Sequence, residues 1–344
     1  MGNSVLDILN NINNDHPPHP NDKILLIDGL NLYIRAFSAN GAVNDKGVPV
    51  GGMVGFLKSL ALLIREINPT RIIVTFDGKG GSKRRRKLHP GYKGNRKPGK
   101  RLTRWDQFQT VEDEQYSMAT QLSRLSEYLE NLPLTTIVVD NIEADDIISY
   151  LVTTIFKEND KCIASGDQDF LQLVDEKTTV WSPSKKRFFT PTTVLEEYNI
   201  PSYNFLIYKS LLGDQSDNIN GVRGLGPKKI PKLLPEIINS PLSITDVVEY
   251  ASTQKGEMFE RITNSEDNLH LNYKLMNLQE TNISGYAKVQ IMEDLEHRSN
   301  LLDKNSFIRL YNNDFLGDSL GRPEQWLNNS FLRLNTLIKQ LTNE

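Results

Sequence analysis

Acidic residues occur in closely spaced groups along this chain, a pattern that can serve metal chemistry. In the densest group, three acids precede a helical pattern and two follow a short apolar run: Glu143, Asp145, Asp146, Asp167 and Asp169. Like charges that are brought together repel one another unless a counterion neutralises them. A hard divalent cation with oxygen ligands is the usual counterion, so these acids are candidate metal ligands. Capping and the helix dipole also favour acids at the start of a helix, so a structural role fits the first three as well.

The apolar runs of the first half predict how these acids are brought together. Two runs have the character of buried strands and end directly in an Asp-Gly pair, at Asp28 and Asp77. Two more runs, 137–139 and 162–164, precede the acids named above. Strands that alternate with helices imply a parallel sheet, whose functional crevice lies beyond the carboxyl ends of the strands. One Asp after a strand is ordinary turn chemistry, but several at one edge favour a metal site.

A strongly basic segment covers residues 79–104. It holds 12 Lys and Arg residues and no acid, whereas the 40 Lys and Arg of the whole chain give an average window of 26 residues about three. Scattered Gly and Pro exclude a simple helix, so we expect a loop that becomes ordered on a polyanion. A nuclear-localisation signal is the alternative. The candidate contacts to nucleic acid, including aromatic residues for base stacking, are Arg35, Arg84, Arg85, Tyr92 and Trp105.

A third informative stretch, residues 211–229, combines acids with a glycine-rich turn. Asp214 and Asp217 lie three positions apart, so they would share one face of a helix. The turn that follows presents backbone N–H groups and two lysines to an anion: Gly221, Gly224, Gly226, Lys228 and Lys229. Its spacing is not that of a Walker A loop, and no strand precedes it as a dinucleotide fingerprint requires. A glycine-rich connection between helices can also be purely structural.

Length and composition describe a globular chain with room for two domains. The chain has 344 residues, a net charge of −3 and a single cysteine, which excludes a disulfide framework and suits a reducing compartment. No apolar run is long enough to span a membrane, and the polar N-terminus is unlike a secretory signal. We therefore expect a cytoplasmic protein.

Taken together, the motifs resemble one family. LLIDGLNLYIRAF, FDG with the basic PGYKGNR, EADD, SGDQDF, and GDQSDN leading into GVRGLGPKK occur in the order and at the spacing of the 5′-nuclease, or flap endonuclease, family. The chain resembles the 5′-nuclease domain of bacterial DNA polymerase I, phage 5′-exonucleases and phage ribonuclease H. The resemblance covers about Lys23–Leu278. Motifs in this order are far more specific than any one of them alone.

The resemblance implies a fold and a division into domains. The fold is expected to be a twisted, mostly parallel α/β sheet with helices on both faces and a helical arch, followed by a mostly helical part that grips duplex DNA. We expect a flexible tail at 1–22 and a nuclease core at 23–185 that includes a basic arch at 79–131. A helical duplex-binding domain would occupy 186–344, with a helix-three-turn-helix element at about 205–235.

The resemblance also implies two Mg²⁺ or Mn²⁺ ions. By motif position, the inner ion would be surrounded by Asp28, Asp77, Glu143 and Asp145. The second would be surrounded, partly through water, by Asp146, Asp167, Asp169, Asp214 and Asp217. Lys93 and Arg96 match the family's phosphate-steering pair and Tyr92 its stacking residue. The Gly221–Lys229 turn matches the hairpin that holds a phosphate, often with K⁺.

The chain departs from the family pattern in two places. Pro231 lies just inside the helix that follows the hairpin, and Pro235 comes next, so we expect that helix to be short or kinked. Beyond Leu278, some 66 residues match nothing in the family.

The expected activity is hydrolysis of phosphodiesters by two metal ions, at 5′ flaps or 5′ ends of duplex DNA and RNA–DNA hybrids, for primer or flap removal in replication and repair. We expect a stand-alone monomer, most simply a phage enzyme in a bacterial cytoplasm. Its substrates would be branched or nicked duplexes, and a single-strand-binding protein or a clamp is a candidate partner. The alternatives are a PIN-class RNA endonuclease, an inactive DNA-binding module and a phosphatase. The hairpin argues against the first and third, and the complete set of acids against the second.

Overall fold

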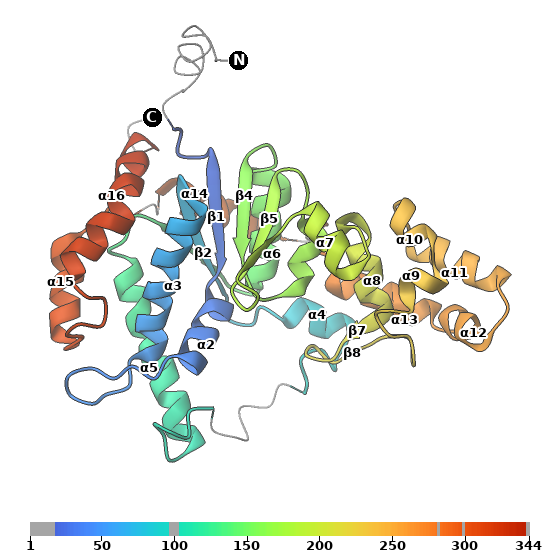
Figure 1. The fold of residues 1–344 in the computed structure, drawn as a ribbon, viewed down its shortest axis with the longest axis horizontal. Coiled ribbons are helices and arrows are strands. Elements are labelled where there is room, and N and C mark those ends of the chain that lie inside the picture. Colours follow the sequence, from blue (N-terminus) through green and yellow to red (C-terminus); the bar gives the residue numbers. More distant parts are fainter. Residues whose placement is uncertain (1–17, 96–102, 281–282, 298–299, 342–344) are drawn as a thin grey trace, which may run out of the picture.

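A six-stranded sheet forms the centre of the first half of the molecule (Figure 1). The computed structural model describes residues 18–95, 103–280, 283–297 and 300–341. The strands are β1 (Lys23–Asp28), β2 (Arg71–Asp77), β3 (Thr135–Val139), β4 (Asp160–Ala164), β5 (Thr178–Ser182) and β6 (Arg187–Phe189). Their order is β3-β2-β1-β4-β5-β6, and all neighbours are parallel except β5 and β6. This confirms the predicted mostly parallel sheet.

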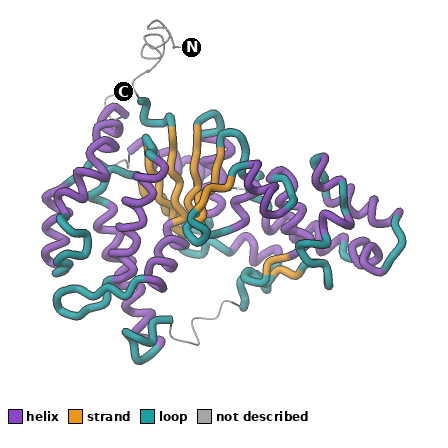
Figure 2. The backbone as a smooth tube through the Cα atoms, in the orientation of Figure 1, coloured by secondary structure: helices purple, strands orange, loops and turns teal. Residues whose placement is uncertain are grey.

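Helices cover both faces of the sheet (Figure 2). The helical elements of this half are α2 (Gly29–Ala39), α3 (Gly51–Ile67), α4 (Lys83–Leu88), α5 (Val111–Leu129), α6 (Ala144–Tyr150), the π-helical turn η1 (Leu151–Ile155) and the 3-10 helix η2 (Gln168–Leu173). Along β1, Leu25 and Ile27 pack with α2, α3 and α5, whereas Ile24 and Leu26 pack with α6. Because both faces are covered, the strand can be apolar throughout.

The parallel strands end at one edge, where they deliver the acids. Asp28 is the last residue of β1, and Asp77 is the last residue of β2. β3 ends four residues before Glu143, and β4 ends three residues before Asp167. The carboxyl ends of parallel strands meet at the same edge, so the fold brings together side chains that lie far apart in the sequence.

A helical part follows the sheet and extends to the right in Figure 1. Its elements are α7 (Pro191–Tyr198), η3 (Ser202–Asn204), α8 (Phe205–Leu212), β7 (Gly213–Asp214), β8 (Ile219–Asn220), α9 (Ile230–Leu233), α10 (Glu236–Asn239), α11 (Ile244–Thr253), α12 (Glu257–Thr263) and α13 (Glu266–Met276). α9 has four residues, with Pro231 as its second, and α10 begins directly after Pro235. The prediction of a short helix after the hairpin is confirmed.

The last three helices return to the sheet rather than extending the helical part. They are α14 (Gly285–His297), α15 (Lys304–Asn313) and α16 (Pro323–Leu341). α14 packs against β3, and Phe307 of α15 and Phe331 of α16 share one apolar cluster with Leu57 of α3. The expectation that 186–344 forms a single helical domain is therefore wrong for its last part. None of the helices that the structure describes combines the length and hydropathy needed to cross a bilayer.

One carboxylate anchors this return. Asp314, directly after α15, accepts hydrogen bonds from Arg124 Nε at 2.9 Å and from Tyr128 Oη at 2.8 Å, both on α5. Its backbone carbonyl accepts a hydrogen bond from Asn44 Nδ2 at 2.9 Å. Tyr128 also packs edge-on against Phe307, with ring centroids 5.0 Å apart. The C-terminal helices thus brace α5, the helix that follows the basic segment.

Replacing Asp314 by Ala should lower the free energy of unfolding by about 1–3 kcal/mol, because Arg124 and Tyr128 lose their shared acceptor. Urea denaturation followed by circular dichroism measures the change. The matched control is Asp318→Ala, an exposed acid of the same loop, which should shift stability by less than about 0.5 kcal/mol. Equal effects of the two substitutions would contradict the bracing role.

Candidate active site

Asp28 and Asp77 are held by the elements that follow them. Asp28 caps α2, because its Oδ1 accepts a hydrogen bond from the N–H of Asn31 at 3.1 Å. Its Oδ2 accepts one from Ser165 Oγ, also at 3.1 Å. Asp77 Oδ1 accepts a hydrogen bond from the N–H of Ala144 at 2.7 Å, which ties the end of β2 to the EADD motif. These donors fix both carboxylates without neutralising their charge.

Several acids lie close enough to repel one another. Burial, together with the charges of Asp167 and Asp77, outweighs the hydrogen bonds from Asn31 and Ser165 and raises the pKa of Asp28 to about 6. Burial also raises the pKa of Asp145 well above its usual value, and Asp167 and Asp28 add to this. Among the ion pairs between described residues, none includes Asp28, Asp145 or Asp167. The described structure therefore leaves net negative charge at this edge.

Glu143, in contrast, is neutralised by the basic segment. One of its oxygens pairs with Arg85 Nη1 and the other with Lys93 Nζ. Burial alone would raise the pKa of Glu143, but the charges of Arg85 and Lys93 outweigh it and hold the pKa below its usual value. The basic segment therefore contacts the acid group directly.

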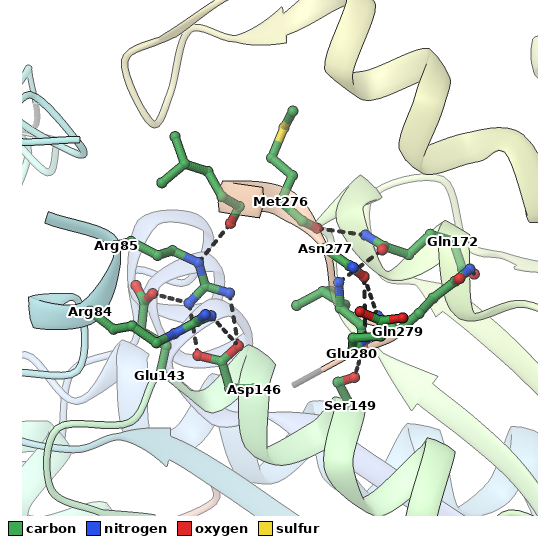
Figure 3. A network of polar contacts seen from close by, with 12 residues as sticks. Arg84, Arg85, Glu143, Asp146, Ser149, Gln172, Met276, Asn277, Gln279 and Glu280 are labelled. Carbon is green, nitrogen blue, oxygen red and sulfur yellow. Dashed lines mark hydrogen bonds and ion pairs between the residues drawn. The ribbon is translucent and has the colours of Figure 1, made fainter. Parts of the chain in front are cut away.

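Asp146 pairs with the same arginine (Figure 3). Arg85 Nη1 donates to Oδ2 and Nη2 donates to Oδ1, both at 2.8 Å. Arg84 Nη2 lies 3.4 Å from Oδ1. Such a two-pronged pair is geometrically specific, because the planar guanidinium matches the carboxylate.

Two residues that we expected to bind nucleic acid are buried instead. Arg85 is 3% exposed and its guanidinium is used by acids, so it cannot bind a phosphate. Tyr92 is 3% exposed and packs with Leu206, Ile219 and Met276, so it cannot stack on a base. Neither side chain faces solvent in the described structure, which the sequence did not indicate because a dense run of charges does not reveal which member faces inward.

A lysine that the sequence analysis overlooked links two further acids. Lys209 of α8 places Nζ 2.9 Å from Asp169 Oδ1 and 2.8 Å from Asp214 Oδ2. Burial raises the pKa of Asp169 to about 7, with help from Asp167 and against the opposing charge of Lys209. Burial would also raise the pKa of Asp214, but Lys209 and Ser216 hold it below its usual value. The available signal was a lysine inside the mostly apolar Phe205–Leu212 run, close before Asp214.

The turn that carries Lys93 packs against the hairpin between β7 and β8. The N–H of Lys93 donates to the carbonyl of Asp217 at 2.9 Å, and Asn218 Nδ2 donates to the carbonyl of Gly91 at 2.8 Å. We expected Asp214 and Asp217 to share a helix face; they lie instead in this hairpin, where Asp214 begins the reversal. The basic segment and the second acid pair are therefore side by side.

The glycine-rich turn after β8 is fixed by its backbone. A Cβ on Gly221 would lie 2.1 Å from the backbone of Leu212, and Gly224 adopts a φ of +82°. Lys229 Nζ donates to the carbonyl of Gly224 at 3.1 Å. The residues of this turn that are exposed or half-buried include Gly224, Gly226, Lys228 and Lys229.

The other residues that we expected to contact nucleic acid lie in different environments. Arg35 is exposed on α2 and donates to the carbonyl of Pro183 at 3.1 Å. Arg84 is half-buried beside Asp146, and Trp105 is 79% exposed. Arg96 lies outside the described residues.

The acids fit a hard divalent cation in type, because every donor at this edge is an oxygen. Among the described residues, however, no three Asp, Glu, His or Cys side chains are placed to hold an ion as they stand. The ion pairs explain this, since four of the acids hold cations of the chain itself: Glu143, Asp146, Asp169 and Asp214. A paired acid would join a metal site only by giving up its cation.

The burial of the Asp28 charge, together with its repulsion by Asp167 and Asp77, predicts that Asp28→Asn stabilises the metal-free protein. The folded carboxyl has a pKa of about 6 against an ordinary 3.8, so above pH 6 its charge opposes folding. Asn still caps α2, and the gain should be on the order of 1–3 kcal/mol at pH 8 in EDTA. It should shrink as the pH falls through 6 and vanish below 3.8, where the carboxyl is protonated in both states.

Thermal unfolding of the two proteins, with EDTA and with Mg²⁺, measures this difference. Mg²⁺ should raise the melting temperature of the wild type more than that of the variant, because bound metal relieves the same repulsion. A variant that is less stable than the wild type at pH 8 in EDTA would contradict the inference that the charge of Asp28 opposes folding.

Known proteins are similar to this chain in amino-acid sequence. The family of the 5′-3′ exonuclease, N-terminal resolvase-like domain, matches residues 23–199. The 5′-3′ exonuclease of Bacillus subtilis is 33% identical over 225 residues, which cover 63% of this chain and 71% of that protein. The thermostable DNA polymerase I of Thermus thermophilus is 33% identical over 219 residues, but these cover 24% of the polymerase. The chain thus spans about a quarter of the polymerase.

Solved structures share the fold. The 5′-exonuclease of bacteriophage T5 with bound zinc has a TM-score of 0.62 at 21% identity, covering 85% of this chain and 98% of that chain. The T5 flap endonuclease in complex with DNA and metal ions has a TM-score of 0.62 at 22% identity, covering 85% and 99%. The fold agreement and the family match over residues 23–199 point the same way. The chain belongs to the 5′-3′ exonuclease family and is a nuclease.

Proposed function

We propose that this nuclease depends on divalent metal and hydrolyses phosphodiesters at 5′ flaps or 5′ ends of duplex DNA and RNA–DNA hybrids. The observation that carries the proposal is the surplus negative charge at the sheet edge, where Asp28, Asp145 and Asp167 lack an ion pair between described residues. The basic segment contacts this edge through Arg85 and Lys93, and it and the exposed lysines of the glycine-rich turn suit the phosphates of a bound strand. A structural relative, the T5 flap endonuclease, has been solved with DNA and metal ions, which supports the proposal.

The acids have distinct proposed roles. Two Mg²⁺ or Mn²⁺ ions would supply hydroxide at neutral pH and stabilise the leaving oxygen. The inner ion would be held by Asp28, Asp77, Glu143 and Asp145. The second would be held by Asp167, Asp169, Asp214 and Asp217, directly or through water. When no metal is bound, Lys209 holds two acids of the second group, Asp169 and Asp214, in place.

The cations have proposed roles as well. Lys93, already at the acid group, would stabilise the charge that develops on the scissile phosphate, a role that the resemblance assigns to Arg96 too. The backbone N–H groups of Gly221–Lys229 would hold a phosphate of the duplex, and the same turn would also bind K⁺. Arg35, Arg84 and Trp105 would contact the strand outside the reacting centre.

The setting of the enzyme is also a proposal. We propose a monomer that works on branched or nicked duplexes in the cytoplasm, with a single-strand-binding protein or a clamp as its replication partner. Light scattering of the protein alone and pull-down with each purified partner test these statements.

The cleavage test compares a 5′-labelled flap, a nicked duplex and an RNA–DNA hybrid in Mg²⁺ and in EDTA. The wild type should cut in Mg²⁺ alone. Asp167→Asn keeps the hydrogen bond from the N–H of Asp169 but weakens the metal site, so the cleavage rate should fall roughly a hundredfold or more. Duplex affinity measured in Ca²⁺ should stay within a few-fold of the wild type.

The matched control is Asp175→Asn, an exposed acid outside the acid group that caps its own turn in the same way. It should cleave at the wild-type rate. Cleavage in EDTA, or normal turnover of Asp167→Asn, would contradict the metal-dependent mechanism. Cleavage of single-stranded RNA with duplexes left intact would instead support the PIN-class alternative.

Changing Lys228 and Lys229 together to Ala should weaken duplex binding and lower its salt dependence. Each phosphate contact contributes about −0.9 to the slope of log affinity against log salt, so the slope should become shallower by nearly two. Fluorescence anisotropy at several salt concentrations measures both quantities. The matched control changes Lys157 and Lys177, two exposed lysines beside β4 and β5 at the opposite edge of the sheet, and should leave the slope unchanged. Equal slopes for the two variants would remove the hairpin from the DNA interface.

A further inference from the structure

A buried arginine lies at the start of the basic segment. α4 has five Lys and Arg residues in its six positions, and Arg85 alone among them is buried. A buried charge costs free energy unless it is paired and hydrogen-bonded. The fold must therefore have a place prepared for this one guanidinium, and its neighbours Arg86 and Lys87 remain exposed.

The place is built from two separate elements, α6 with its N-cap and α13 (Figure 3). Two nitrogens of Arg85 reach Asp146 of α6, each at 2.8 Å, and one of them also pairs with Glu143. Its Nε donates to the carbonyl of Leu275 in α13 at 2.8 Å. Arg85 therefore connects the basic segment, the acid group and the helical part through a single side chain.

The end of α13 is held to the core at further points. Gln172 of η2 donates to the carbonyl of Met276 at 3.0 Å and accepts from the N–H of Leu278 at 2.9 Å. Ser149 Oγ donates to the carbonyl of Leu278. α13 packs against α8, the helix that carries Lys209. The position of α13 at Arg85 is thus linked to both groups of acids.

Lys93 and Arg85 hold Glu143 in different ways. Lys93 reaches one Glu143 oxygen from a turn, and its side chain is 14% exposed. Arg85 is 3% exposed and makes a fork with Asp146 in addition to its contact with Glu143. Lys93 can exchange its partner for a phosphate or give way to a metal ion. Moving Arg85 would instead remove both 2.8 Å bonds from the buried Asp146 and leave it only the contact with Arg84 at 3.4 Å.

We propose that Arg85 and Asp146 form a positioning pair in which Asp146 binds the guanidinium instead of a metal ion, and Arg85 fixes Glu143 and the base of the arch relative to α13. The inference rests on the proposed function, because Glu143 matters to cleavage only as part of the metal site. It changes the expected role of both residues. Asp146 is then not a metal ligand, and Arg85 is not a contact to DNA.

The experiment compares Arg85→Met, Asp146→Asn and the double variant. Each single variant removes the two-pronged pair, so that buried Asp146 keeps only Arg84 or buried Arg85 keeps only Glu143, and should lower the melting temperature by several degrees. The double variant removes both charges and should recover most of the loss. In the double variant, single-turnover cleavage of a flap at saturating enzyme should still be about 10–100-fold slow, as is typical when a group that orients a metal ligand is lost. Its DNA affinity should be close to that of the wild type, because Arg85 is buried.

Isothermal titration with Mn²⁺ on the DNA-free proteins provides a readout that does not depend on cleavage. The double variant should bind as many Mn²⁺ ions as the wild type, whereas Asp145→Asn, at the neighbouring position, should bind fewer or bind them more weakly. Arg86→Ala, an exposed neighbour in α4, should lose DNA affinity rather than single-turnover rate.

Two results would overturn the proposal. A double variant that regains both stability and cleavage rate would show that the pair is only structural. Loss of a Mn²⁺ site in the double variant would show that Asp146 is a metal ligand. A wild type that does not cleave in Mg²⁺ would refute the proposed function instead, and the melting temperatures and Mn²⁺ isotherms would still decide whether Asp146 serves Arg85.

Discussion

Carboxylates lie buried and close together at one edge of the parallel sheet, and both their burial and their mutual repulsion oppose folding unless cations offset them. Consecutive parallel strands end side by side, so acids that follow each strand are forced together whatever their distance in the sequence. Here Asp28 and Asp77 end their strands, and the acids after β3 and β4 arrive at the same edge. The fold is compatible with this only because part of the charge is neutralised from within.

The neutralising cations come from outside the sheet, and this organises the molecule. Arg85 and Lys93 belong to the basic segment, and Lys209 belongs to α8 of the helical part. Each of these ion pairs holds a neighbouring element against the acids. The negative charge of the sheet edge therefore attaches both the basic segment and the helical part to the sheet. The acids that remain without an ion pair between described residues are Asp28, Asp145 and Asp167, whose pKa values are raised chiefly by burial, and we propose that these acids bind the metal ions.

The sequence predicted the features that depend on local pattern and chain order. Apolar runs that end in Asp-Gly identified β1 and β2, and their alternation with helices placed Asp28 and Asp77 at one edge. Features that depend on tertiary packing were not accessible. A run of five basic residues does not show that Arg85 alone turns inward, and the aromatic type of Tyr92 suits stacking on a base as well as burial beside Met276. The return of 285–341 to the sheet depends on which faces α3 and α5 leave uncovered, and only the assembled core decides that.

We propose that the sheet edge holds divalent ions at the acids that the chain's own cations leave unpaired. Anomalous diffraction from crystals grown with Mn²⁺ would locate these ions. We expect anomalous peaks within bonding distance of the carboxylate oxygens of Asp28, Asp145 or Asp167, with Arg85 still bound to Asp146. Absence of any peak at this edge, or a Mn²⁺ ion on Asp146 in place of Arg85, would contradict it.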